Sequence, residues 1–317
     1  MHDLAIITIS TNEAHWLRPC LTSVFAHQGA AALDVIVVDN ESSDGTRELV
    51  EAEFPAARVV SCANKGFSHA NNRGLMASDA RYVLYLNPDT EILEGTFGDL
   101  VAAMDARPMV GLAGVKQVTP DGVLFPTVRW FPSPTRALFD ALGFERFPLR
   151  SRWLGERELR LDRYETELPC DWTSGSFMLA RREALVSAGA MDERFFIYSE
   201  EPDLCLRMKR AGWEIRHLPT MTILHHAGKA GLSARMLAQE AYTRRQYARK
   251  HFSPGRRAAY EAAVGVGLAL RWAAARDAER RRAFGRALGT LVGVVPAPFG
   301  APPPVAVAPS ATPPAGA

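Results

Sequence analysis

The sequence has few cysteines and no CxxC pair, which argues against proteins that are held together by disulfides or by structural zinc. Its four cysteines, Cys20, Cys62, Cys170 and Cys205, are far apart in the chain. This spacing argues against a disulfide framework and against a zinc site, and favours reduced thiols in the cytoplasm. The first apolar run, residues 4–9, follows an acid and breaks into polar loop residues, so it is typical of a strand rather than a signal peptide.

Long apolar runs are also missing from the C-terminal part. Residues 258–270 are interrupted by Glu261 and end at Arg271, and residues 288–295 are much shorter than the roughly 20 residues that cross a bilayer. Two alternatives remain for this region: an interfacial helix pair, or a soluble helical hairpin with a solvated basic face. The cationic side chains that would face the headgroups are Arg276, Arg280, Arg281, Arg282 and Arg286.

The chain has little net charge, +2, but the charge is distributed unevenly. Residues 229–286 contain 14 Lys and Arg against 4 Asp and Glu, which leaves the remainder at −8. An acidic main body argues against a nucleic-acid partner, whereas the basic part suits peripheral contact with anionic lipid. We therefore expect a cytoplasmic protein that contacts the inner face of the cell membrane through its C-terminal part.

What the sequence does contain is a regular alternation of apolar runs and amphipathic segments. Its 317 residues suit one large α/β domain or two small ones. The alternation predicts a mostly parallel sheet flanked by helices, with right-handed crossovers. The predicted strands are residues 4–9, 33–38, 58–61, 82–86 and 110–115, and the predicted helices between them include residues 44–54, 68–76 and 96–106.

The regular alternation ends after Lys116. Residues 123–130 and 138–154 are rich in Pro, Arg and aromatics, and we expect a strand pair and an irregular lid there. A strand over residues 177–180 follows, and then a helix for which Pro202 suits the first position. Short strands are expected at residues 214–218 and 222–224.

Carboxylates follow two of the predicted strands. Residues 82–86 end abruptly in Asn87-Pro88-Asp89, and residues 33–38 end at Asp39. Ligands bind beyond the carboxyl ends of parallel strands, so these acids are well placed to hold a metal or a polar substrate. The alternatives are an ordinary turn at Asp89 and a helix or turn cap at Asp39.

Several segments occur together in a recognisable order: IITISTNEAHWLRPCLTSV, VIVVDNESSDGT, NKGFSHANNRGL, YLNPDTEI, DWTSGSFMLARREAL and FFIYSEEPDLCLRMKRAGW with HHAGKAG. With these segments the sequence resembles the family 2 glycosyltransferases of the GT-A fold, and in particular their bacterial rhamnosyltransferase-like members. The resemblance implies a Rossmann-like GT-A domain over residues 1–233. The C-terminal part lies outside the resemblance, and its charge and composition predict a basic helical extension over 234–295 and a Pro/Ala-rich disordered tail over 296–317.

The resemblance implies a nucleotide-sugar donor and a divalent metal, Mg²⁺ or Mn²⁺. Asp89 takes the place of the metal-binding acid of the family's DxD motif, and Asn87 replaces the first acid, which predicts weak or substrate-dependent metal binding. His225 is a further candidate ligand, with His226 as the alternative. The residues implied to bind the donor are Thr8, Ser10, Asn12, Asp39, Asn64, Gly66, Asn71 and Asn87.

The family's catalytic base lies in a Glu-Asp pair at a helix N-terminus, and here the pair is Glu200-Glu201. The resemblance implies that Glu201 removes the proton from the acceptor hydroxyl, while Glu200 or Asp203 could share that role. These acids could instead cap the helix and form ion pairs with Arg207 and Arg210.

On the acceptor side the resemblance implies Asp171, Trp172 and Asp203, with Trp172 stacking on a sugar ring or belonging to the core. The expected activity is inverting transfer of a sugar, most plausibly L-rhamnose from dTDP-L-rhamnose, to a glycan or polyprenyl-linked acceptor in bacterial surface-polysaccharide assembly. The alternative is a catalytically impaired GT-A domain that acts as a nucleotide-sugar-binding or assembly subunit. A nucleotidyltransferase is disfavoured because no Gly-rich phosphate loop follows the first strand.

Overall fold

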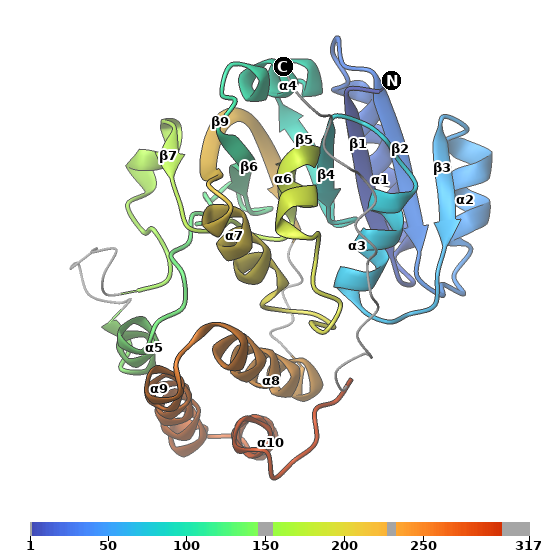
Figure 1. Ribbon diagram of the computed structural model, residues 1–317. Coiled ribbons are helices and arrows are strands. Elements are labelled where there is room, and N and C mark those ends of the chain that lie inside the picture. The colour runs from blue at the N-terminus through green and yellow to red at the C-terminus, as the bar shows by residue number, and fades with distance from the viewer. Residues whose placement is uncertain (1, 145–154, 227–232, 300–317) are drawn as a thin grey trace.

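The computed structural model describes residues 2–144, 155–226 and 233–299. In this part of the chain one mixed sheet has the strand order β3-β2-β1-β4-β8-β6-β9-β5, and β7 pairs with β9 (Figure 1). The strands are β1 (Leu4–Ser10), β2 (Leu33–Asp39), β3 (Ala57–Ser61), β4 (Tyr82–Leu86), β5 (Thr90–Glu94), β6 (Val110–Val118), β7 (Leu168–Pro169), β8 (Phe177–Arg181) and β9 (Glu214–His225). The helices are α1 (Ala14–Ala26), α2 (Thr46–Glu53), α3 (Phe67–Met76), α4 (Phe97–Asp105), α5 (Pro134–Ala141), α6 (Arg182–Ala188), α7 (Glu200–Arg210), α8 (Ala234–His251), α9 (Pro254–Ala274) and α10 (Ala278–Val292), with a 3₁₀ turn at Leu161–Glu165.

The first half of the sheet follows the sequence prediction. Strands β3, β2, β1 and β4 are all parallel, and every residue of β1 and β4 is buried. Strands buried on both faces require continuous apolar runs, which is why these segments could be recognised. Their carboxyl ends lie at one edge of the sheet, where Asp39 ends β2 and Asp89 follows β4.

The second half departs from a purely parallel arrangement. Strand β8 lies antiparallel between β4 and β6, and β5, which was not predicted, pairs antiparallel with β9. The two short strands expected near the end of the sheet are one strand, β9. Its pairing with β6 shifts register between Gly114 and Lys116, and Pro219 fits at this irregularity because it has no N–H to donate to a ladder.

The expected strand pair at residues 123–130 is wrong. Within the described residues this segment makes only isolated bridges, Val118 with Leu124 and Arg129 with Arg157 and Trp172. Pro126 interrupts the segment, and a residue without an N–H cannot sustain a ladder. Part of the expected lid is helix α5, and residues 145–154 lie outside the described residues.

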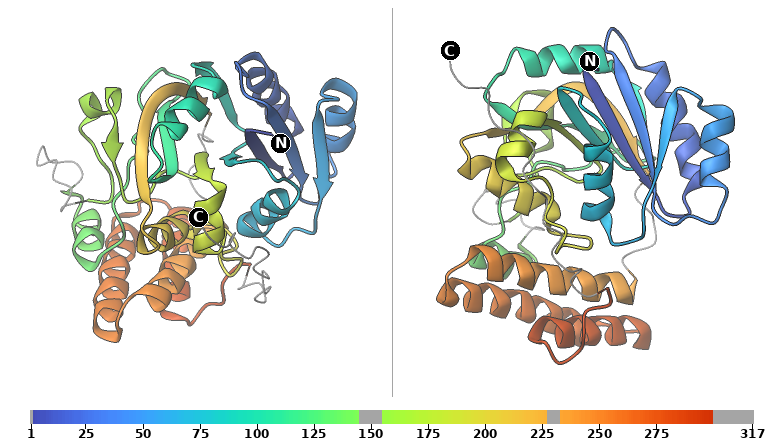
Figure 2. Two further views of the ribbon diagram at one scale, coloured as in Figure 1. Left: turned by 45° about the horizontal axis from the view of Figure 1, so that its top comes forward. Right: turned by 45° about the vertical axis from the view of Figure 1, so that its right-hand side comes forward.

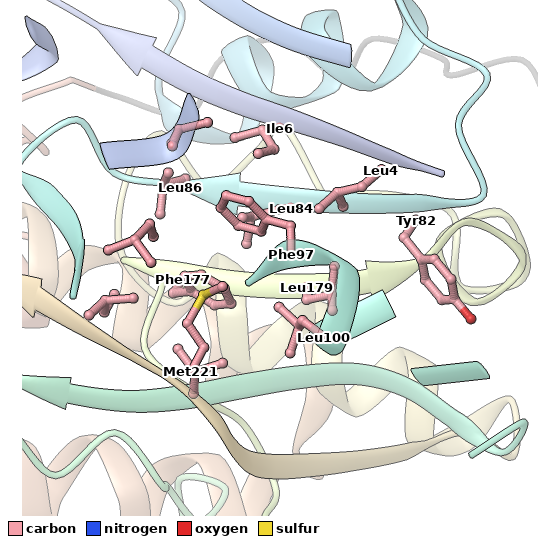
Figure 3. Close-up of a cluster of buried hydrophobic side chains, with 14 of the residues drawn as sticks. Leu4, Ile6, Tyr82, Leu84, Leu86, Phe97, Leu100, Phe177, Leu179 and Met221 are labelled. Atoms are coloured by element: carbon pink, nitrogen blue, oxygen red, sulfur yellow. The ribbon is translucent and has the colours of Figure 1, made fainter. Parts of the chain in front are cut away.

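Helices cover both faces of the sheet, and each face has its own apolar core. Residues from α1, α2 and α4 pack on one face, and residues from α3, α6 and α7 pack on the other. Figure 3 shows the first core, in which alternate side chains of β4 meet the side chains of α4. The residues labelled there are Leu4, Ile6, Tyr82, Leu84, Leu86, Phe97, Leu100, Phe177, Leu179 and Met221.

The C-terminal helices α8, α9 and α10 form a separate layer beside the sheet, next to α5 (Figures 1 and 2). They share a third apolar core, to which α5 contributes Ala137. An ion-pair cluster fastens this layer to α7: Asp203 accepts from Lys250 at 2.6 Å and from His251 at 2.7 Å. In the ranges that the structure describes, none of the helices is both long and apolar enough to cross a membrane.

Candidate active site

A cavity of about 450 Å³ lies at the carboxyl edge of the parallel strands. Such an edge is where open α/β sheets bind ligands. Polar side chains from seven separate segments of the chain converge there. The lining residues are Ile9, Thr11, Glu13, Asn40, Asn64, Phe67, Asn87, Pro88, Asp89, Ser174, Gly175, Ser176, Phe196, Ile197, Tyr198, Glu200, Glu201, His225 and Phe299.

One part of the cavity is built by Asp89 and His225. Thr90 pairs with His225 in the antiparallel β5–β9 ladder, which brings the preceding carboxylate close to the imidazole. The Nε2 atom of His225 lies 3.4 Å from Oδ1 of Asp89. The Nδ1 atom of His225 is buried without a hydrogen-bond partner among the described residues. The pair therefore presents one oxygen and one nitrogen donor to the cavity.

The neighbouring His226 is engaged elsewhere. Its Nε2 lies 2.6 Å from Oε1 of Glu91, and its ring packs against Trp16 with the centroids 4.5 Å apart. Successive residues of an extended chain point to opposite faces, which separates the two histidines. This geometry favours His225 over His226 as the residue that meets a ligand.

Glu13 also lies in this part of the cavity and was not predicted from the sequence. It follows the first strand, immediately before α1, and its carboxyl group is close enough to Asp89 to feel its charge. Burial, and then the Asp89 carboxylate, raise the pKa of Glu13 to about 7. Adjacent acids that repel each other in a cleft are typical of sites for cations.

Glu200 and Glu201 lie at the N-terminus of α7 and both line the cavity. Glu200 is only 2% exposed, and its Oε2 has no hydrogen-bond partner in the described part of the chain. Burial and the charge of Glu201 hold the pKa of Glu200 well above its usual range. Burial also raises the pKa of Glu201, while the Arg129 guanidinium acts against that rise. A carboxylate with a raised pKa is a better proton acceptor near neutral pH.

Gly175 leaves the space that Glu201 occupies. A Cβ atom at this glycine would lie 2.7 Å from Oε1 of Glu201. Tyr198 and Ser199, the two residues that precede Glu200, have φ angles of 71° and 70°. Left-handed backbone in consecutive residues other than glycine is strained, and such strain is concentrated at functional sites. Gly175 thus allows the Glu201 side chain to approach closely, and the strained loop leads directly into the helix that carries this side chain.

The structure brings together six of the site residues expected from the sequence. These are Asn64, Asn87, Asp89, Glu200, Glu201 and His225, all of which line the cavity. Each of them lies at or just after the end of a strand or at the start of a helix, which explains why motif position could place them.

Other residues expected at the donor site support the cavity without lining it. Thr8 is fully buried within β1, and Ser10 bonds to the hydroxyl of Thr46. Asn12 accepts the backbone N–H of Ser43 at 2.7 Å. Asp39 accepts the N–H of Ser42 at 2.9 Å, as a turn cap does, and its neighbour Asn40 is the lining residue.

Gly66 and Asn71 likewise lie behind the wall of the cavity. Gly66 has a φ of 104°, and a Cβ there would lie 2.4 Å from the carbonyl oxygen of Phe196, so this glycine allows the loop before α7 to approach. Asn71 is 1% exposed. Its neighbour Asn72 donates to the Met191 carbonyl and to Glu193, which ties α3 to the same loop.

None of the three residues expected on the acceptor side lines the main cavity. Asp171 accepts from the N–H of Phe131 and from Lys209. Asp203 is fully buried in the ion-pair cluster with α8. Trp172 donates from Nε1 to the carbonyl of Trp130 and lines a second, smaller cavity that also reaches Glu201.

Phe299 comes from the segment expected to be a disordered tail. Its ring stacks on Phe196 with the centroids 4.3 Å apart, and the Arg235 guanidinium lies 4.0 Å above it. Phe299 thereby forms part of the cavity wall. Residues 300–317 of the expected tail lie outside the described residues.

The arrangement is similar to that of known sugar-transferring enzymes. The chain superposes on Staphylococcus aureus TarS in complex with UDP-GlcNAc with a TM-score of 0.56 at 16% identity, covering 93% of this chain and 82% of that one. It superposes on the mannosyltransferase PcManGT from Pyrobaculum calidifontis, in complex with GDP-Man and Mn²⁺, with a TM-score of 0.53 at 18% identity, covering 91% and 80%. The fold is that of the GT-A glycosyltransferases.

The sequence comparisons narrow this class to a family. The family model for glycosyl transferase family 2 matches residues 5–185, and the chain belongs to this family. It is 34% identical over 206 residues to N-acetylglucosaminyl-diphospho-decaprenol L-rhamnosyltransferase of Mycobacterium tuberculosis, covering 61% of this chain and 66% of that protein. It is 26% identical to rhamnosyltransferase WbbL of Escherichia coli K12, covering 70% of this chain and 83% of that protein. The chain is therefore a rhamnosyltransferase-like glycosyltransferase.

Proposed function

We propose that this protein is an inverting, metal-dependent transferase that moves L-rhamnose from dTDP-L-rhamnose to a hydroxyl of a polyprenyl-linked or glycan acceptor in bacterial surface-polysaccharide assembly. The observation that carries the proposal is that the Asp89–His225 pair and the Glu200–Glu201 pair face one cavity. The first pair suits a diphosphate with its cation, and the second suits a hydroxyl that must lose a proton.

The residues present fit a divalent cation that is shared with the substrate. Among the described residues no cluster of three His, Cys, Asp or Glu could hold a metal by itself. Asp89 and His225 would supply one oxygen and one nitrogen donor, and phosphate oxygens would complete the coordination, as is usual for Mg²⁺. Carboxylate and other oxygen ligands suit Mn²⁺ as well as Mg²⁺. When bound, the cation would neutralise the charge of the leaving nucleoside diphosphate.

The proton transfer falls to Glu201. Its carboxylate accepts the proton of the acceptor hydroxyl while the hydroxyl oxygen forms a bond to the anomeric carbon, and the bond to the diphosphate breaks on the opposite side. A single displacement of this kind inverts the anomeric configuration. Burial and the charge of Glu201 raise the pKa of Glu200, so Glu200 retains its proton to a higher pH than an exposed carboxyl does and limits the negative charge beside Glu201.

The donor and acceptor are proposed from the relatives. Two relatives have names that specify rhamnosyl transfer, and one of these names specifies an N-acetylglucosaminyl-diphospho-decaprenol acceptor. The chain covers 66% of that relative, so the substrate assignment is part of the proposal. The two structural neighbours were solved with nucleotide-sugars, one of them with Mn²⁺.

We place the protein at the inner face of the cell membrane through its C-terminal helices. Some of the apolar residues of α9 and α10, among them Val264, Leu268 and Leu291, pack in their shared core. However, Val266, Leu270 and Trp272 of α9 are 43%, 47% and 46% exposed. Together with the arginines of α10 they would form an interfacial contact rather than a span.

A panel of nucleotide-sugars tests the donor assignment. A ligand that binds only the folded state stabilises it by mass action and so raises the melting temperature. At a ligand concentration of 100 times Kd, the free energy of unfolding increases by about 2.7 kcal/mol. We expect dTDP-L-rhamnose with Mn²⁺ to stabilise the protein more than UDP-, GDP- or other dTDP-sugars. A larger effect of another donor would overturn the donor assignment. Binding without any transfer or hydrolysis would indicate the alternative, a catalytically impaired nucleotide-sugar-binding subunit.

A further inference from the structure

A second cavity, of about 120 Å³, lies between the sheet domain and the C-terminal helices. It shares two lining residues, Tyr198 and Glu201, with the main cavity. The Glu201 carboxylate thus stands where the two cavities meet. Residues from α8 and α9, which lie beyond the part matched by the family model, supply much of the remaining wall.

The lining of this cavity combines aromatic rings with buried charged groups. Trp172, Tyr198, Tyr247 and Tyr260 contribute rings, and Glu156, Glu240 and Arg244 contribute polar groups. Ring faces suit the C–H surface of a pyranose, and carboxylates and guanidinium groups suit its hydroxyls. The cavity volume of about 120 Å³ is several times the roughly 10–15 Å³ that one water needs. The cavity can therefore hold a ligand larger than a single water, such as part of a sugar residue.

Glu156 has an unmet hydrogen-bonding capacity in this cavity. It is 8% exposed, and its Oε1 has no hydrogen-bond partner among the residues that the structure describes. Buried carboxylate oxygens are normally paired, and an exception calls for a ligand or another explanation. Across the cavity, Arg244 donates to Oε1 of Glu240 from Nη2 at 2.8 Å and from Nε at 3.1 Å. Arg244 thus holds that carboxylate in a fixed position.

The walls are held rigidly relative to Glu201. Asp203, one turn after Glu200 on α7, pairs with Lys250 and His251 of α8. Lys250 also pairs with Asp192 at 2.5 Å, in the loop before α7. The helix that carries the base and the helix that carries Glu240 and Arg244 are therefore joined by buried ion pairs.

We propose that this second cavity is the subsite for the terminal sugar residue of the acceptor, which presents its reacting hydroxyl to Glu201. The inference rests on the proposed transferase function and adds that the C-terminal helices recognise the acceptor. Glu156 and the Glu240–Arg244 pair accept and donate hydrogen bonds to the sugar, and Trp172 and Tyr198 pack on its ring.

Binding of an acceptor probe tests this assignment apart from catalysis. The full chain, saturated with dTDP and Mn²⁺, is titrated calorimetrically with a short-chain prenyl-diphosphate N-acetylglucosamine. We expect Glu156→Gln and Glu240→Gln each to weaken binding of the probe about tenfold or more. A site that is built to hydrogen-bond the hydroxyls of a ligand binds that ligand less tightly when one of its hydrogen-bonding carboxylates is removed. Both variants should bind dTDP as wild type does. Glu261→Gln on α9, which lines neither cavity of the described chain, is the matched control and should bind the probe normally.

Unchanged probe affinity in both variants would overturn the subsite, as would equal weakening by Glu261→Gln. A variant that fails to fold loses dTDP binding as well, and the other variant then decides. Free N-acetylglucosamine is the second arm: if only the prenyl-diphosphate probe binds, and neither variant affects it, the recognised group is the lipid diphosphate and the sugar subsite is wrong. Failure of the proposed function has a different signature, because wild type would then bind no dTDP or would transfer no sugar.

Discussion

His225 Nε2 and Asp89 Oδ1 lie 3.4 Å apart in the cavity, although the two residues are separated by more than a hundred positions in the chain. The β5–β9 pairing creates this proximity, with Thr90 opposite His225. It follows that the proposed cation site depends on a strand that the sequence did not reveal. The two residues should therefore contribute to one binding event.

Asp89→Ala should abolish the effect of metal on nucleoside diphosphate binding. The carboxylate is 20% exposed and lines the cavity, so its loss should affect the ligand rather than the fold. Calorimetry of dTDP binding with and without Mn²⁺ measures this directly. If Mn²⁺ strengthens binding to the variant as much as to wild type, Asp89 is only a turn residue.

His225→Ala and His226→Ala form a matched pair. Removal of His225 should weaken Mn²⁺-dependent dTDP binding by about tenfold or more, the scale on which groups around a metal matter. Removal of His226 should change it less than about twofold, because this imidazole bonds to Glu91. Mn²⁺ titrations of both variants provide the measurement, and the reverse order of effects would contradict the assignment.

Glu200→Gln should stabilise the protein increasingly as the pH rises. Burial raises the folded-state pKa of Glu200. At a pH below the unfolded-state pKa, the carboxyl group is protonated in both states and does not reduce the stability. At a higher pH the unfolded state releases a proton that the folded state retains, so the wild type loses stability as the pH rises, until the pH exceeds the folded-state pKa. Melting temperatures at pH 5 and pH 8 should show a larger gain for the variant at pH 8. A gain that is independent of pH would mean that Glu200 does not hold a proton.

Trp272→Glu should abolish binding to anionic vesicles while dTDP binding is retained. Trp272 is 46% exposed on α9, and the substitution places a negative charge where the proposed contact is. Met76→Glu on α3, at a residue that is 65% exposed, is the control and should leave flotation with vesicles unchanged. Equal flotation of wild type and Trp272→Glu would place the membrane contact elsewhere or show that there is none.

The sequence was informative wherever function lies next to a recognisable strand or helix end. Strand β4 was predicted with its observed limits. A short apolar run is typical of a buried strand, and the Asn-Pro-Asp that follows it ends the strand because Pro88 cannot continue a central ladder. Asp89, Glu200 and Glu201 could be placed in one cavity for the same reason. Departures from the family pattern at Asn87 and Glu201 did not prevent this, since both residues line the cavity.

The sequence was uninformative wherever the environment depends on distant segments. Asp203 pairs with Arg207 one turn along α7, as the spacing allows, but it also pairs with Lys250 and His251 from α8, which no local pattern indicates. Glu13 stands in an unremarkable polar loop, and its raised pKa results from burial and from Asp89. Phe299 belongs to a segment with the composition of a disordered tail, yet it stacks on Phe196 at the cavity.

The most direct test of the central claim is the rate of sugar transfer by Glu201→Gln. The amide keeps the size of the side chain and much of its hydrogen bonding, but it cannot accept a proton. We predict unchanged dTDP and dTDP-sugar affinity and a loss of transfer of about 10²-fold or more, the usual contribution of general-base catalysis. Transfer at the wild-type rate by Glu201→Gln, with Glu200→Gln inactive, would contradict the account and assign the base to Glu200.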